Sequence, residues 1–353
     1  MTATPSPPVH SRRITPIGVI AGVIGLALFV YTFQRAGLGE IATLIGRLGW
    51  VFIGVVALGG LRFFMRGMAW RRCLEGSHRL GPGPAFQAVV AGDTLGNLTF
   101  LSILVSEPTK ALFVADREPI GRTLPALAVE NLFYTLSAAL VIAGGAVALL
   151  LRLGTIDTWW VASVAVVATI IGLVALVHLV IWRRVRVASG SLDTLARRGL
   201  GLAARWAARV RDAEDRVYRL YPRQANQLAA LSAWELAFHA LAVLEICLVL
   251  SLISPVAPTL LDAFVFEAVN RFIAVVFKVV PMRIGVDEAG TAAFAELLEF
   301  GTAAGVTLAL VRKARMLVWM IIGGLLLARR GLSVGSAIAD AEGQATVDDG
   351  PPR

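Results

Sequence analysis

The feature that most constrains this chain is a series of apolar stretches that carry almost no charge. Each is about 20 residues long, enough for an α-helix to cross a bilayer core about 30 Å thick. A helix also satisfies its backbone hydrogen bonds within its own segment, as hydrocarbon requires. The stretches lie near residues 14–33, 48–69, 84–105, 123–151, 158–182, 228–253, 259–281, 289–311 and 314–328.

Composition supports the same interpretation. The chain is 57% hydrophobic and 16% charged, whereas soluble proteins are about half apolar and about a quarter charged. We predict an all-α polytopic integral membrane protein with about six to eight transmembrane helices. Residues 14–332 form the predicted single transmembrane domain, and the polar compositions of 1–13 and 333–353 predict disorder.

Arginine placement predicts the orientation of the chain. The net charge is +9, and the segment 183–227 alone carries eleven Arg against four acids. Positive charge marks the cytoplasmic loops of membrane proteins. We therefore interpret the excess of Arg as a sign of cytoplasmic loops and expect no nucleic-acid partner. Both termini are then cytoplasmic, and the expected location is the bacterial inner membrane.

The Arg-rich segment 183–227 is also predicted to be amphipathic. Its apolar residues recur every three or four positions. They are Leu202, Trp206, Val210, Ala213, Val217 and Leu220. Two interpretations stay open: an interfacial helix that binds anionic lipid, or a solvated helix packed against the ends of the spans.

Loop charge predicts two broken elements. The segment 84–122 must begin and end in the cytoplasm, and its second arm is too short to span, so we predict a re-entrant hairpin that folds back around Glu107-Pro108. The segment 259–311 must start and finish outside, as a full pair of spans or as a second hairpin that breaks at Pro281–Glu288. Two broken elements that enter the membrane from opposite faces are typical of inverted-repeat transporters.

Polar side chains inside apolar stretches are the candidate functional residues, because ionised groups at membrane depth are costly and mark substrate paths. In the first half they are Asp93, Asn97, Glu107, Lys110, Glu130 and Asn131. In the second half they are Glu267, Asn270, Arg271, Lys278, Arg283, Asp287, Glu288, Arg312, Lys313 and Arg315. The functional interpretation is a path for an anionic headgroup. The alternatives are polar pairs between helices, headgroup-level ion pairs, and snorkelling anchors for the last three cations.

A second polar group lies in the stretch 228–253. Glu235 and His239 are four residues apart, with Glu245 deeper. They could relay protons or form a structural pair. The sequence shows no zinc-type His-Glu-x-x-His, no phosphate-binding Gly-Lys-Ser/Thr loop and no nucleophile elbow, so we predict neither a catalytic site nor a metal or cofactor.

At these motifs, over about residues 40–330, the chain resembles the lysylphosphatidylglycerol synthase transmembrane-region family of flippase-like proteins. The matching residues are Asn97 with Ser106-Glu107-Pro108-Thr109-Lys110, Glu130, Pro281 through Gly285-Val286-Asp287-Glu288, and Arg312-Lys313-Ala314-Arg315. Ser106 stands where the family has Gly, and the family's upstream Pro is absent. We expect a stand-alone member without the soluble aminoacyl-transferase domain, so the resemblance does not imply lipid lysylation.

The resemblance implies a module that moves or binds a lipid headgroup. We therefore predict a flippase-like transporter, not an enzyme, that moves an anionic lipid or a polyprenyl-phosphate-linked substrate between leaflets. The expected partner is a membrane lipid or lipid-linked headgroup. The alternative is a non-transporting membrane subunit or lipid-binding partner of a glycosyltransferase or lipid-synthesis enzyme.

Overall fold

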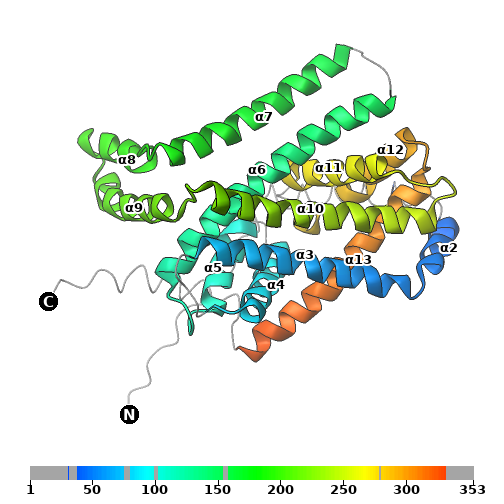
Figure 1. The fold of residues 1–353 in the computed structure, drawn as a ribbon, viewed down its shortest axis with the longest axis horizontal. Coiled ribbons are helices and arrows are strands. Elements are labelled where there is room, and N and C mark those ends of the chain that lie inside the picture. Colours follow the sequence, from blue (N-terminus) through cyan, green and yellow to red (C-terminus); the bar gives the residue numbers. More distant parts are fainter. Residues whose placement is uncertain are drawn as a thin grey trace.

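A computed structural model describes residues 31, 38–74, 80–98, 102–153, 158–277 and 280–330. These residues form twelve α-helices and one 3-10 helix, without strands (Figure 1). The elements are α2 (Leu38–Leu48), α3 (Val51–Cys73), α4 (Pro82–Leu98), α5 (Ser102–Phe113), α6 (Ile120–Leu153), α7 (Thr158–Trp182), α8 (Ala188–Arg197), α9 (Gly201–Leu220), α10 (Ala225–Ile253), α11 (Leu260–Val276), η1 (Pro281–Arg283), α12 (Val286–Leu297) and α13 (Thr302–Arg329). The predictions for the two chain ends and for Lys278 fall outside the described residues.

The predicted all-α membrane class is confirmed. In the described part of the chain, α3, α6 and α10 are long and apolar enough to cross a membrane, and the 167–182 part of α7 is a shorter apolar helix. Helix α13 has 28 residues, which corresponds to about 42 Å, with three cations near its middle. The count of six to eight spans stays a prediction.

Two apolar cores lie at the two ends of the helix bundle. One contains Trp70, Phe113 and Leu127, and the other contains Leu250 and Phe266. The long helices α3, α6, α10 and α13 each contribute to one core at one end and to the other core at the opposite end. Ionisable residues occupy the middle of these helices, between the cores. The bundle therefore has a polar layer at mid-depth.

Helices α4 and α5 form a tight hairpin. A Cβ added at Gly92 would lie 2.7 Å from the Ser106 carbonyl oxygen, so the hairpin requires a residue without a side chain there. The predicted reversal at Glu107-Pro108 is wrong, because α5 runs through both residues, and the helices that pack together are α4, which ends at Leu98, and α5, which begins at Ser102. A proline inside a helix removes one hydrogen bond and kinks the helix without having to reverse it.

We expect the Gly92→Ala variant to be less stable than the parent protein. The new methyl group must push the Ser106 backbone away, and overpacking of this kind costs about 1–3 kcal/mol. Gly172→Ala in α7 is the matched control, because no atom lies within 4 Å of a Cβ at Gly172. Thermal unfolding in detergent measures both, and equal midpoints would contradict the close approach of α4 and α5.

The second half contains the predicted break after α11. Met282, Arg283 and Gly285 have φ angles of 50°, 49° and 83°, so the backbone leaves the helical region there. The η1 turn contacts α4, which belongs to the other hairpin. The tip of one broken element therefore meets the other near the polar layer. Whether either is re-entrant stays a prediction.

The bounds predicted for the apolar segments 289–311 and 314–328 are wrong as helix bounds, because α12 ends at Leu297 and α13 begins at Thr302. The chain breaks at 298–301 instead, where Glu299 and Gly301 have φ angles of 67° and 86°. Helix α13 then continues through the basic cluster without interruption. The apolar residues around Glu299 concealed the break, and Arg and Lys are good helix formers that do not end a helix.

The Arg-rich segment forms an antiparallel pair, α8 and α9, at one end of the molecule (Figure 1). The apolar stripe predicted for this segment packs against the rest of the protein only in part. Val217 and Leu220 pack against the first core, whereas Leu202 is 71% exposed and Trp206 is 51% exposed. Arg211 and Asp193 join the two helices with an N–O distance of 2.6 Å. Both interpretations of this segment stay open.

Candidate functional site: a charged cavity between two apolar cores

A cavity of about 600 Å³ lies in the polar layer. The two hairpins and the middles of the long helices surround it. Cations from five parts of the chain line it. They are Arg62 and Arg66 of α3, Lys110 of α5, Arg271 of α11, Arg283 of η1, and Arg312, Lys313 and Arg315 of α13.

The cavity brings most of the residues predicted from the sequence together. Twelve of them line it, namely Asp93, Asn97, Glu107, Lys110, Asn131, Asn270, Arg271, Arg283, Asp287, Arg312, Lys313 and Arg315. Three carboxylates, Glu130, Glu267 and Glu288, are not lining residues but each pairs with a lining cation. Lys278 lies outside the described residues.

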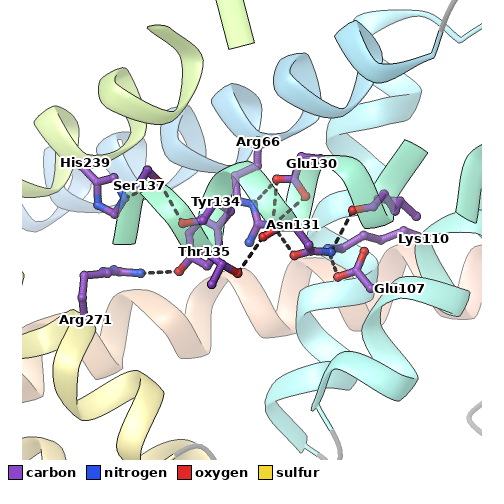
Figure 2. Close-up of polar contacts among 11 residues, drawn as sticks. Arg66, Glu107, Lys110, Glu130, Asn131, Tyr134, Thr135, Ser137, His239 and Arg271 are labelled. Atoms are coloured by element: carbon purple, nitrogen blue, oxygen red, sulfur yellow. Dashed lines mark hydrogen bonds and ion pairs between the residues drawn. The ribbon is translucent and has the colours of Figure 1, made fainter. Parts of the chain in front are cut away.

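The first ion cluster joins α3, α5 and α6 (Figure 2). The guanidinium of Arg66 donates two hydrogen bonds to the Glu130 carboxylate, at 2.8 and 2.9 Å, and a third to the Asn131 carboxamide oxygen at 3.1 Å. Lys110 donates to Glu107 at 2.7 Å. Because Glu130 is almost fully buried, the bidentate geometry offsets part of its desolvation cost.

The second cluster centres on Glu267 of α11, which is fully buried. Arg271 lies 2.7 Å away one helical turn later, and His239 of α10 lies 3.2 Å away. Tyr134 connects the two clusters. Its hydroxyl accepts a hydrogen bond from Arg271 at 2.7 Å, and its ring lies 4.2 Å below the Arg66 guanidinium carbon (Figure 2).

The third cluster fixes the start of α12 at the cavity. Glu288 accepts a hydrogen bond from the Gly285 backbone N–H at 2.8 Å, and the Lys313 ammonium group donates to it at 2.5 Å. Arg283 pairs with Asp287 at 3.1 Å. Glu288 thus connects the break at Gly285 with Lys313 of α13. The helix dipole at the start of α12 also stabilises its carboxylate.

Two of the cavity's guanidinium groups have unused donors. Arg62 lies 3.6 Å from Glu245 and 4.0 Å from Glu267, distances too long for hydrogen bonds, and its Nε has no partner. Arg312 has no ion pair with any described residue. Arg315, by contrast, pairs with Glu245. Arg62 and Arg312 are therefore the cations most available to an anion in the cavity.

One wall of the cavity is apolar. Residues of α6, α7 and α11 make it, namely Ala138, Ala139, Ile142, Ile170, Val174, Phe272, Val275 and Val276. Helix α7 lies along the outer side of the bundle next to α6 (Figure 1). Phe272 and Val275 are 41% and 57% exposed. The cavity thus combines a cationic wall with an apolar wall that continues to the outer surface.

The sequence interpretation missed three residues of the site. Arg62 and Arg66 lie four residues apart in the apolar stretch 48–69, and the insertion-cost argument applied to Glu130 would have selected them. Tyr134 carries no charge, so no comparable signal marks it. Glu245, which was open to a relay or a structural interpretation, forms an ion pair with Arg315.

The model of one family matches residues 18–324 of the chain, and its description is "Lysylphosphatidylglycerol synthase TM region". Comparison with curated proteins and with solved structures found no match. The described residues contain no group of His, Cys, Asp and Glu that could hold a metal ion.

Proposed function

Since the chain belongs to the lysylphosphatidylglycerol synthase transmembrane-region family, we propose that it moves an anionic lipid or a polyprenyl-phosphate-linked substrate between leaflets. The observation that carries this proposal is the cavity with one cationic and one apolar wall. A soluble anion needs only the first wall, whereas an amphiphile needs both. The family match is to a membrane region and not to a catalytic domain, which supports transport over an enzymatic role.

The headgroup binds between Arg62 and Arg312. Both guanidinium groups line the cavity, and their donors are not used by carboxylates at hydrogen-bond distance. A guanidinium fork matches the oxygens of a phosphate and can donate two hydrogen bonds to it. The remaining cations are paired with acids, so they set the local potential without having to leave their partners.

The hydrocarbon chains stay on the apolar wall. The exposed apolar side chains of α7 and α11 continue this wall to the surface. The headgroup then travels through the polar layer while the chains remain in the bilayer. The two broken elements, α4–α5 and α11–α12, control access from opposite sides, with Glu107 and Glu288 in corresponding places.

A variant that fills the cavity tests this proposal. Ala274 of α11 lines the cavity, and Ala274→Trp is expected to lower the scrambling of a fluorescent anionic lipid to the rate of protein-free liposomes. Ala240→Trp in α10 is the matched control, because Ala240 is exposed on the outer surface of an apolar helix. Equal scrambling by the parent protein and the Ala274→Trp variant would reject the cavity as the path.

A further inference from the structure

Glu235 of α10 is a buried carboxyl group that the proposed path does not use. Its side chain is 2% exposed, it does not line the cavity, and neither carboxyl oxygen has a hydrogen-bond partner among the described residues. The charged groups that act on it are Glu130 of α6 and Arg66 of α3, with the Cys73 thiol also near. Glu235 therefore lies next to the first ion cluster but does not face the cavity.

One arginine faces two carboxyl groups in this place. Arg66 donates two hydrogen bonds to Glu130 and one to Asn131, and none of its donors reaches Glu235, so the negative charge of an ionised Glu235 would have no hydrogen-bonded partner. An unpaired buried carboxylate is so costly that the group takes up a proton instead. We therefore infer that Glu235 is neutral beside the Arg66–Glu130 pair.

Loss of the proton from Glu235 would change the cavity. Two carboxylates would then compete for Arg66, which lines the cavity on its other side, and the cluster would change from neutral to a net charge of −1. This charge repels an anion and draws the guanidinium away from it. Proton binding and anion binding are therefore mutually favourable, and linkage makes this coupling reciprocal.

We propose that Glu235 is a proton-binding site that couples movement of the anionic substrate to movement of one proton in the same direction. The inference rests on the proposed transport function. One proton enters with one negative charge, so the step is electroneutral. Glu235 takes the proton from water while the cavity is open to one side of the membrane and returns it to water while the cavity is open to the other, and no covalent bond other than the O–H bond of Glu235 forms or breaks.

The other titratable groups around Glu235 supply the controls. His239 lies one turn further along α10 and is occupied by Glu267 and Ser137, while Cys73 lies on α3. We expect Glu235→Gln, which imitates the neutral acid, to bind phosphatidylglycerol as well as the parent does at low pH. In the parent protein binding weakens as the pH rises, and in Glu235→Gln this weakening is lost. The control variants His239→Gln and Cys73→Ala are expected to retain the pH-dependent weakening of binding. The phosphodiester of the lipid probe does not titrate near neutral pH, so it does not contribute to this dependence.

Two readouts separate failure of this inference from failure of the proposed function. Infrared difference spectroscopy of the purified protein, without any lipid substrate, is expected to show a protonated carboxyl band that Glu235→Gln removes. Liposomes with an imposed proton gradient are expected to accumulate labelled phosphatidylglycerol in one leaflet with the parent protein, and only to equilibrate it with Glu235→Gln. An unchanged band in Glu235→Gln, or parent binding that is independent of pH, would overturn the proton site. Absence of any lipid movement by the parent, with the band present, would overturn the transport function instead.

Discussion

Simultaneous replacement of Arg62 and Arg312 by glutamine is expected to abolish binding of an anionic lipid to the purified protein. Each guanidinium has donors free for a phosphate. Hydrogen bonds to charged groups contribute about 1.5–3 kcal/mol each, so each single replacement weakens binding by roughly 10- to 150-fold. Native mass spectrometry or displacement of a fluorescent lipid measures this change.

The matched control for these arginines is Arg329→Gln, at the exposed end of the same helix α13. This variant removes one positive charge from the protein without changing the cavity, and its lipid affinity is expected to equal that of the parent. If Arg329→Gln weakened binding as much as Arg312→Gln, general surface charge would explain the affinity, and the assignment of the two guanidinium groups would be wrong.

The second large effect is expected at the ion pair between Glu267 and Arg271. Replacement of one partner by an apolar residue, as in Glu267→Leu, leaves Arg271 as a buried charge without its carboxylate. Breaking a buried pair in this way costs about 3–5 kcal/mol. The double variant Glu267→Leu/Arg271→Met removes both charges, so we expect it to recover most of this loss. Denaturant unfolding in micelles measures the free energies.

An exposed pair provides the comparison for that cycle. Arg186 and Asp215 lie 3.3 Å apart in the α8–α9 region, with side chains 53% and 41% exposed. Water already solvates both groups, so Asp215→Leu is expected to change stability by less than about 1 kcal/mol. A loss at Glu267 as small as the loss at Asp215 would show that the polar layer is open to water and not buried.

The sequence predicted the composition of the cavity better than the course of the chain around it. Residues such as Glu130 and Arg271 were recognisable because charge in an apolar stretch is costly, and the structure places both at the polar layer. The sequence could not predict which charges meet. Glu245 pairs with Arg315, 70 positions away, and only the packing of α10 against α13 decides that contact.

The turns were the least predictable part. Pro108 is a strong local signal, yet α5 accommodates it, because one missing hydrogen bond costs less than the packing of the hairpin gains. The turn at Glu299–Gly301 has a weak local signal within an apolar run, yet it separates two helices. Local preference and tertiary packing compete at such places, and packing decides.

The separation of the two apolar cores by a polar layer has a consequence for how this architecture can change over evolution. Each core is a separate hydrophobic cluster, so most of the apolar packing lies away from the cavity. Substitutions that exchange one balanced charge pair for another within the layer change the charge pattern of the cavity while both clusters keep their packing. If the proposed transport function holds, relatives of this chain can therefore differ in substrate while the two cores stay unchanged.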